Sequence, residues 1–97
     1  MSTQTDETIL LPARIRLPQA EELLARLRDI PPDRPVTLAA AEVEELGTPA
    51  VIALVSALSV REALTPPMIV HGASEAFVEA FTDLGAFSHM MKMEFRA

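Results

Sequence analysis

Two histidines are the side chains of this sequence best suited to act as acids, bases or metal ligands near neutral pH. His71 follows a short apolar run at the carboxyl end of an expected strand, where open α/β sheets bind their ligands. His89 stands far from it, and neither histidine has a cysteine nearby or a second histidine four positions along a helix. This spacing predicts surface or loop roles for both histidines and no metal site.

The remaining polar residues form no known catalytic or nucleotide-binding motif. Glu42, Glu44 and Glu45 are clustered, as is typical of a solvated acidic loop. The sequence contains no phosphate-binding glycine loop and no nucleophile elbow, and its lack of cysteine excludes disulfides and thiol nucleophiles. We therefore expect no enzymatic activity and no bound cofactor.

Residues 47–60 are unusual because they carry no charged side chain. Thr48 followed by Pro49 is a typical helix start, with a hydroxyl N-cap and a proline in the first turn, so a helix is expected to about Val60. A surface helix in so small a domain should offer a polar side to water. We therefore expect part of this helix to bind a partner, the alternative being a helix buried on all sides. The expected partner-binding residues are Gly47, Thr48, Pro49, Ala50, Val51, Val55, Ser56 and Ser59.

This segment lies within an alternation of strand and helix patterns. The other expected helices lie between Pro18 and Ile30, with a stripe of Ala20, Leu23, Leu24, Leu27 and Ile30, and between the N-cap Ser74 and Gly85. An edge strand is expected at residues 9–11, continuing to Ile15 and Leu17, and a central strand covered on both faces is expected at residues 36–40. A short strand is expected at residues 68–70, and a half-exposed strand at residues 90–95. Between them, residues 42–46 are expected to form an acidic loop. This order predicts an α/β domain with a small, mixed or partly parallel sheet of about four strands, flanked by about three helices.

Length and charge limit the functions open to the chain. Its 97 residues suit one domain, expected at residues 8–97 after a flexible tail at residues 1–7. The net charge of −6 repels phosphate backbones, so no nucleic-acid partner is expected. The polar N-terminus is unlike a secretory signal and no apolar run is long enough to cross a bilayer. These features favour a cytoplasmic protein without membrane insertion.

The sequence resembles the STAS family, named for sulfate transporters and anti-sigma-factor antagonists, over nearly the whole chain. The resemblance rests on the element order and on two groups of residues: Val36, Thr37, Leu38, Val43 and Leu46 before a helix start, and Ile69, Val70, His71, Ala76, Phe77, Leu84 and Gly85. In that family the strand similar to residues 36–40 precedes an Asp-Ser/Thr-x-Gly turn, whose hydroxyl can be phosphorylated by a partner kinase. Thr48 falls on this hydroxyl, with Gly47 in place of the Asp and Ala50 in place of the Gly. The resemblance therefore implies Thr48 as a phosphorylation candidate.

The function that the resemblance implies is a non-enzymatic regulatory module in bacterial partner-switching or chemotaxis-type signalling. Its protein partner would be an anti-sigma factor or kinase, or a chemotaxis component. An alternative is the accessory STAS subunit of an ABC-type lipid-transport ATPase. An alternative of another class is a small-ligand-binding or enzymatic α/β domain that uses His71, Ser74 and Thr48 near the strand ends. An apolar helix can also pair with its own copy, which makes a homodimer a further alternative.

Overall fold

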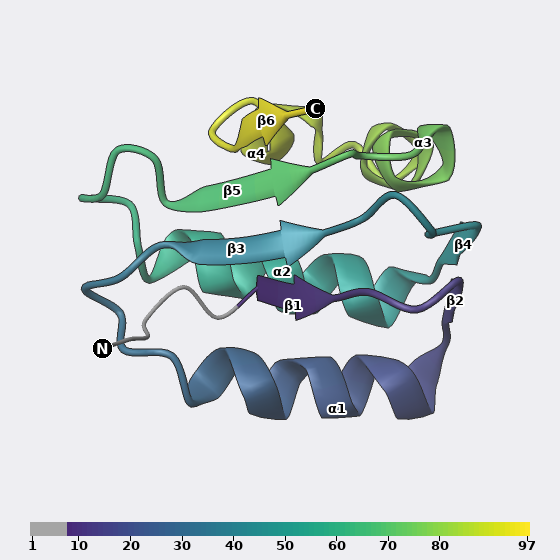
Figure 1. Ribbon diagram of the computed structural model, residues 1–97, viewed down its shortest axis with the longest axis horizontal. Coiled ribbons are helices and arrows are strands. Elements are labelled where there is room, and N and C mark those ends of the chain that lie inside the picture. The colour runs from purple at the N-terminus through teal and green to yellow at the C-terminus, as the bar shows by residue number, and fades with distance from the viewer. Residues whose placement is uncertain (1–7) are drawn as a thin grey trace.

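The computed structural model describes residues 8–97, which alternate between strands and helices (Figure 1). The elements are β1 (Thr8–Leu10), β2 (Arg14–Ile15), α1 (Leu17–Arg28), β3 (Val36–Ala39), β4 (Glu45–Leu46), α2 (Thr48–Ser59), β5 (Met68–His71), α3 (Glu75–Asp83), α4 (Phe87–Met90) and β6 (Glu94–Arg96). The α/β class predicted from the sequence is confirmed. The tail expected at residues 1–7 lies outside the described residues.

Four strands form the main sheet in the order β1-β3-β5-β6, and every pairing is parallel. Ile9 pairs with Leu38, Leu38 with Val70, and Val70 with Phe95, so residues in register run straight across the sheet. The predicted edge position of the first strand and the central position of residues 36–39 are confirmed. Each crossover steps to the next strand in the same direction, and such crossovers are almost always right-handed, which places the connecting helices on one face. In Figure 1, α2 passes behind β1 and β3.

The two faces of the central strand differ in burial. Val36 and Leu38 are fully buried, whereas Thr37 and Ala39 alternate with them and are only half-buried. The prediction that this strand is covered on both faces is therefore wrong for the second face. Small uncharged side chains tolerate a half-exposed surface, so the absence of charge in this strand does not require a second layer of helices.

A second sheet of two short strands lies where α1 and α2 begin (Figure 1). β2 and β4 pair in parallel, with Ile15 opposite Leu46. The sequence predicted that the first strand continues to Leu17 and that residues 42–46 form a loop, but Leu17 opens α1 and the end of this loop forms β4. Ile15 and Leu46 are both buried, and burial of these two side chains favours the pairing of β2 with β4. The two strands are too short for the local sequence pattern to indicate them.

The start of α3 is as predicted from the sequence. The Ser74 hydroxyl accepts a hydrogen bond from the Phe77 N–H at 3.2 Å and donates one to the Val43 carbonyl oxygen at 2.7 Å. Gly85 follows α3 with a φ of 71°, the left-handed conformation expected there. Ser74 therefore caps its helix and also ties it to the loop after β3.

The C-terminal strand is shorter and later than predicted. Residues 87–90 form the short helix α4, and the strand expected at residues 90–95 begins only at Glu94. Met90 and Met93 are both buried, and they are separated by about one helical turn. Packing of these two methionines into the core outweighs the alternation of Met91, Met93 and Phe95 that suggested a strand.

Arg61 is a charged side chain that is only 2% exposed. Its Nε donates to the carbonyl oxygen of Arg34 at 2.8 Å, its Nη1 to Ala57 at 2.9 Å, and its Nη2 to Ile30 at 2.8 Å and Pro31 at 3.4 Å. The Ala57 carbonyl lies in the last turn of α2, where a helix carries partial negative charge, and the other three lie in the segment between α1 and β3. Desolvation lowers the pKa of Arg61, and the surrounding carbonyl oxygens offset the cost of burying the charge. The guanidinium therefore holds the ends of α1 and α2 together.

We expect Arg61→Met to lower the free energy of unfolding by about 2–4 kcal/mol, because buried carbonyl oxygens would lose their donor. Urea denaturation followed by circular dichroism measures this change. Arg61→Lys should recover only part of the loss, since an ammonium group cannot span the same carbonyls as a planar fork. The exposed Arg14→Met serves as the control and should stay within about 0.5 kcal/mol of the wild type. A loss below about 1 kcal/mol for Arg61→Met would contradict this role.

Candidate protein-docking site

α2 begins with Gly47 as its N-cap. The Gly47 carbonyl oxygen accepts hydrogen bonds from the N–H groups of Ala50 at 3.1 Å and Val51 at 3.2 Å. Thr48 and Pro49 therefore occupy the first turn, and no side chain caps this helix. The predicted helix is confirmed, but the prediction that the Thr48 hydroxyl is its N-cap is wrong, because the preceding residue supplies the cap with its backbone. Thr48 is exposed to solvent.

The position of Gly47 allows two backbone segments to approach closely. Its N–H donates to the Ile15 carbonyl oxygen at 2.9 Å, which extends the pairing of β2 with β4 by one residue. A Cβ atom on Gly47 would lie 3.1 Å from that same oxygen. A side chain at this position would therefore push the two segments apart.

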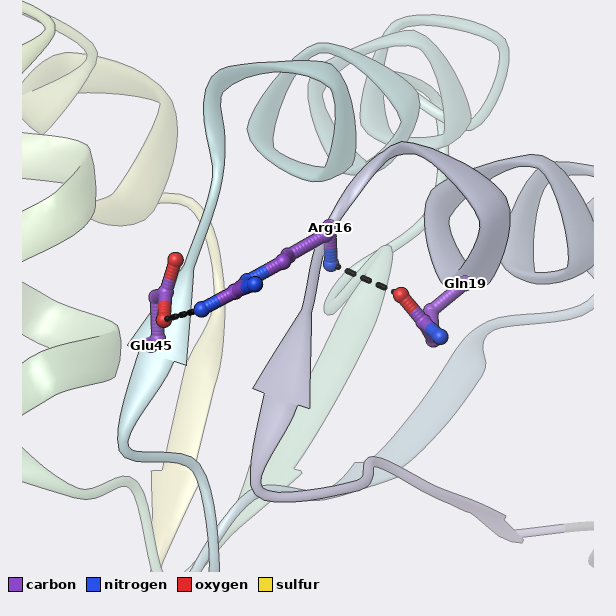
Figure 2. Close-up of polar contacts among 3 residues, drawn as sticks. All are labelled: Arg16, Gln19 and Glu45. Atoms are coloured by element: carbon purple, nitrogen blue, oxygen red, sulfur yellow. Dashed lines mark hydrogen bonds and ion pairs between the residues drawn. The ribbon is translucent and has the colours of Figure 1, made fainter.

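One ion pair lies near the start of the two helices (Figure 2). Arg16, the N-cap residue of α1, forms an ion pair with Glu45 of β4 at 3.3 Å, and its backbone N–H donates to Gln19 Oε1 at 3.1 Å. Both partners of the ion pair are largely exposed, so the pair contributes little to stability. Glu44, the residue before Glu45 in the sequence, is also exposed. A group attached to Thr48 would thus lie close in sequence to two carboxylates, one of them already paired.

The structure separates the predicted partner-binding residues into three groups by burial. Ala50 and Val51 are buried, so they cannot contact a partner in this conformation. Gly47 and Val55 are half-buried, and the exposed members are Thr48, Pro49, Ser56 and Ser59. The prediction that Ala50 and Val51 bind a partner is therefore wrong for this conformation, because absence of charge does not reveal which side of a helix faces the core.

Two large apolar residues of α2 that were not predicted as partner-binding are exposed instead. Ile52 is 59% exposed and Val60 is 63% exposed. Together with Ser56 they lie at intervals of four residues, which places all three on one side of the helix. This spacing is visible in the sequence, but identifying it as the outer side requires knowing that the residues around Leu54 face the sheet.

An apolar groove of about 530 Å³ separates this side of α2 from α1. Its floor includes the small side chains of Ala20, Ala53 and Ala57, which leave space between the helices. Leu17, which is 57% exposed, stands at one end of the groove. The full lining is Leu17, Ala20, Glu21, Leu24, Leu27, Arg28, Ile30, Pro32, Pro49, Ile52, Ala53, Ser56, Ala57, Val60 and Arg61. The arrangement offers apolar contact to another molecule and few polar groups for chemistry.

The helical stripe predicted for α1 divides between the core and this groove. Ala20, Leu23 and Leu27 are buried and Leu24 and Ile30 are half-buried, and all of them except Leu23 line the groove. The spacing predicted that these residues share one side of the helix, but spacing does not show which of them stay open to solvent. A single apolar stripe can serve both purposes, because the edge of the stripe remains open where the neighbouring helix does not cover it.

The residues of the alternative ligand site are absent from the linings of two hollows formed by the described residues. His71, Ser74 and Thr48 line neither the α1–α2 groove nor a second hollow of about 490 Å³ between β1 and α1. The Ser74 hydroxyl already accepts from Phe77 and donates to Val43. These two hollows therefore provide no setting in which the three side chains could act on one ligand.

We expect Gly47→Ala to destabilise the protein by about 1 kcal/mol, because alanine is a poor N-cap and its Cβ would crowd the Ile15 carbonyl. Thr48→Ala should change the free energy of unfolding by less than about 0.5 kcal/mol, since its hydroxyl is not the cap. Chemical denaturation of both variants measures the difference. The reverse order, with Thr48→Ala the more destabilised variant, would restore Thr48 as the capping residue.

Comparison with known proteins identified no matching family model, no similar curated protein and no similar solved structure. Among residues 8–97, no helix combines the length and apolar character needed to span a bilayer. Nor do three or more His, Cys, Asp or Glu side chains of that region come together in a way that could hold a metal ion. The features of the chain that bear on function are therefore those of its own surface.

Proposed function

We propose that this chain is a non-enzymatic regulatory module that binds a protein partner through the α1–α2 groove and the adjoining start of α2. The observation that supports the proposal is the outer side of α2, where Ile52 and Val60 are both more than half exposed beside an apolar groove. Exposed apolar surface of this kind is stabilised by contact with another apolar surface, because its removal from water is favourable. Contiguous apolar patches on small domains commonly mark sites of protein association.

The rigidity of the groove is consistent with docking. Pairing of Ile15 with Leu46 joins the starts of α1 and α2, and the Arg61 guanidinium joins their ends. The two helices that form the groove would therefore need little rearrangement to bind a partner, which reduces the conformational entropy lost on binding. An amphipathic helix is a suitable ligand for such a surface, because its apolar stripe can lie between two parallel walls.

The proposed pathway rests on the resemblance to the STAS family. Under this proposal the chain acts in the bacterial cytoplasm, in partner-switching or chemotaxis-type signalling, and a kinase phosphorylates Thr48. Thr48 is exposed and precedes Pro49, which lines the groove, so a phosphate there would lie at the groove's end. The helix dipole favours a phosphate at this terminus, and the fold should tolerate it. The same charge would be costly to desolvate against an apolar partner, which would favour release.

Affinity capture from the native host, with identification of bound proteins by mass spectrometry, tests the docking surface. Ile52→Glu should weaken capture of the specific partner at least about tenfold, because a buried charge would replace an apolar contact. Met91→Glu is the matched control, since Met91 is 67% exposed but does not line the groove, and it should retain the partner. Equal capture by both variants would rule out the groove as the docking site.

The phosphorylation switch requires a separate measurement on the captured partner. Thr48→Glu should bind it about tenfold more weakly than Thr48→Ala, because the added carboxylate must be desolvated beside the apolar groove. Isothermal titration calorimetry with the purified partner gives both affinities. Equal affinities would remove the switch and leave a constitutive adaptor.

A further inference from the structure

The rim of the α1–α2 groove carries two exposed charges of opposite sign, Glu21 and Arg28. Both belong to α1 and are separated by about two helical turns, so they lie on the same side of the helix. The third charged side chain of the lining, Arg61, is buried and bonded to backbone carbonyls. The rim is therefore acidic toward the start of α1 and basic toward its end.

The two walls of the groove are aligned along their length. Ile15 pairs with Leu46, and the N-caps Arg16 and Gly47 follow directly, so α1 and α2 begin at the same level. They then run side by side in the same direction, away from β2 and β4 (Figure 1). With this alignment, the midpoint between Glu21 and Arg28 is level with Ser56 to within about one residue, or about 1.5 Å.

Ser56 is also the midpoint between the two exposed apolar residues of α2, Ile52 and Val60. Consider a second copy of the chain related to the first by a two-fold axis that crosses α1 and α2 at right angles at the level of Ser56. Each helix of the second copy then runs opposite to the same helix of the first. It places Glu21 opposite Arg28 of the other copy and Ile52 opposite Val60 of the other copy. The same two-fold rotation thus pairs opposite charges of the two copies and also pairs their exposed apolar side chains.

We propose that the α1–α2 face binds a second copy of this chain, with α1 antiparallel to α1 and α2 antiparallel to α2 across a two-fold axis near Ser56. This inference rests on the proposed function in so far as it takes the α1–α2 face to be a docking surface, and it names the partner. The interface is isologous, which is the usual form of a homodimer. Its centre is apolar, and reciprocal Glu21–Arg28 ion pairs flank it.

Charge favours this arrangement over unspecific stacking of two chains. Each chain carries a net charge of −6, so two copies repel each other in most orientations. The two-fold pairing brings opposite charges together at both ends of the groove, and opposite charges select orientation and register in protein interfaces. Antiparallel packing also sets the dipoles of facing helices in opposite directions, which is favourable.

Sedimentation equilibrium and light scattering on the full chain test the proposal. At about 100 µM the wild type should have twice the mass of the 10.5 kDa chain. Glu21→Arg and Arg28→Glu should each weaken dimerisation about tenfold or more, because like charges would then face each other. The double variant Glu21→Arg with Arg28→Glu should return to within about threefold of the dimerisation affinity of the wild type, since it restores both opposite-charge pairs.

Ile52→Glu should give a monomer and Met91→Glu a dimer, with circular dichroism confirming that each variant is folded.

The possible failures are distinguishable from failure of the proposed function. A monomeric wild type, a dimer unaffected by Ile52→Glu, or a double variant that does not recover would each overturn the two-fold pairing. If the chain is monomeric and Ile52→Glu still loses a captured partner, the groove docks a different protein and only the self-pairing is rejected. If Ile52→Glu changes neither self-association nor capture, the docking surface itself is rejected as well.

Discussion

The arrangement of the two outer helices depends on one buried guanidinium. Arg61 forms no ion pair with a carboxylate among residues 8–97, and its charge is stabilised by backbone carbonyl oxygens that lie at or just beyond the ends of α1 and α2. Only the Ala57 carbonyl belongs to a helix, and those of Ile30, Pro31 and Arg34 lie in the segment between α1 and β3. The planar guanidinium satisfies several of these oxygens at once, while each helix keeps its own backbone C-cap. The interaction thereby ties the segment that follows α1 to the last turn of α2.

The opposite end of the helix pair is held by backbone pairing. β2 and β4 place Ile15 beside Leu46, and the Gly47 N–H extends the pairing to the Ile15 carbonyl oxygen. Because both helices are restrained at both ends, the small residues between them leave a groove of defined shape. Small residues alone would allow the helices to close on each other. The groove therefore results from the two restraints together with the alanines of its floor, and a rigid groove loses little entropy when it is filled.

The chemistry of the groove favours association and offers little for catalysis. Its surface is formed mainly by aliphatic side chains, with one exposed charge of each sign on the rim. Ser74, which a catalytic interpretation would need, is occupied in capping α3 and in binding the Val43 carbonyl. Opposite charges at the two ends of an apolar groove provide orientation, and the exposed side chains of Ile52 and Val60 provide the surface to be buried. The proposed binding role draws on the same features that position the helices.

The amino-acid sequence by itself determined the α/β class, the edge and central positions of the first strands, the N-cap at Ser74 and the uncharged character of α2. These properties depend on local signals: apolar spacing, capping residues and the absence of charge over a segment. Only the tertiary structure decided which side of α2 is buried, because Val51 and Ile52 are equally apolar and differ only in facing the sheet or the groove. It likewise decided the pairing of β2 with β4, the shift of the cap from Thr48 to Gly47 and the role of Arg61. The strand pairing and the contacts of Arg61 depend on groups distant in sequence that folding brings within a few ångströms, and a local pattern carries no information about them. The cap at Gly47 is local, but the same residue also donates its N–H to the distant Ile15 carbonyl oxygen.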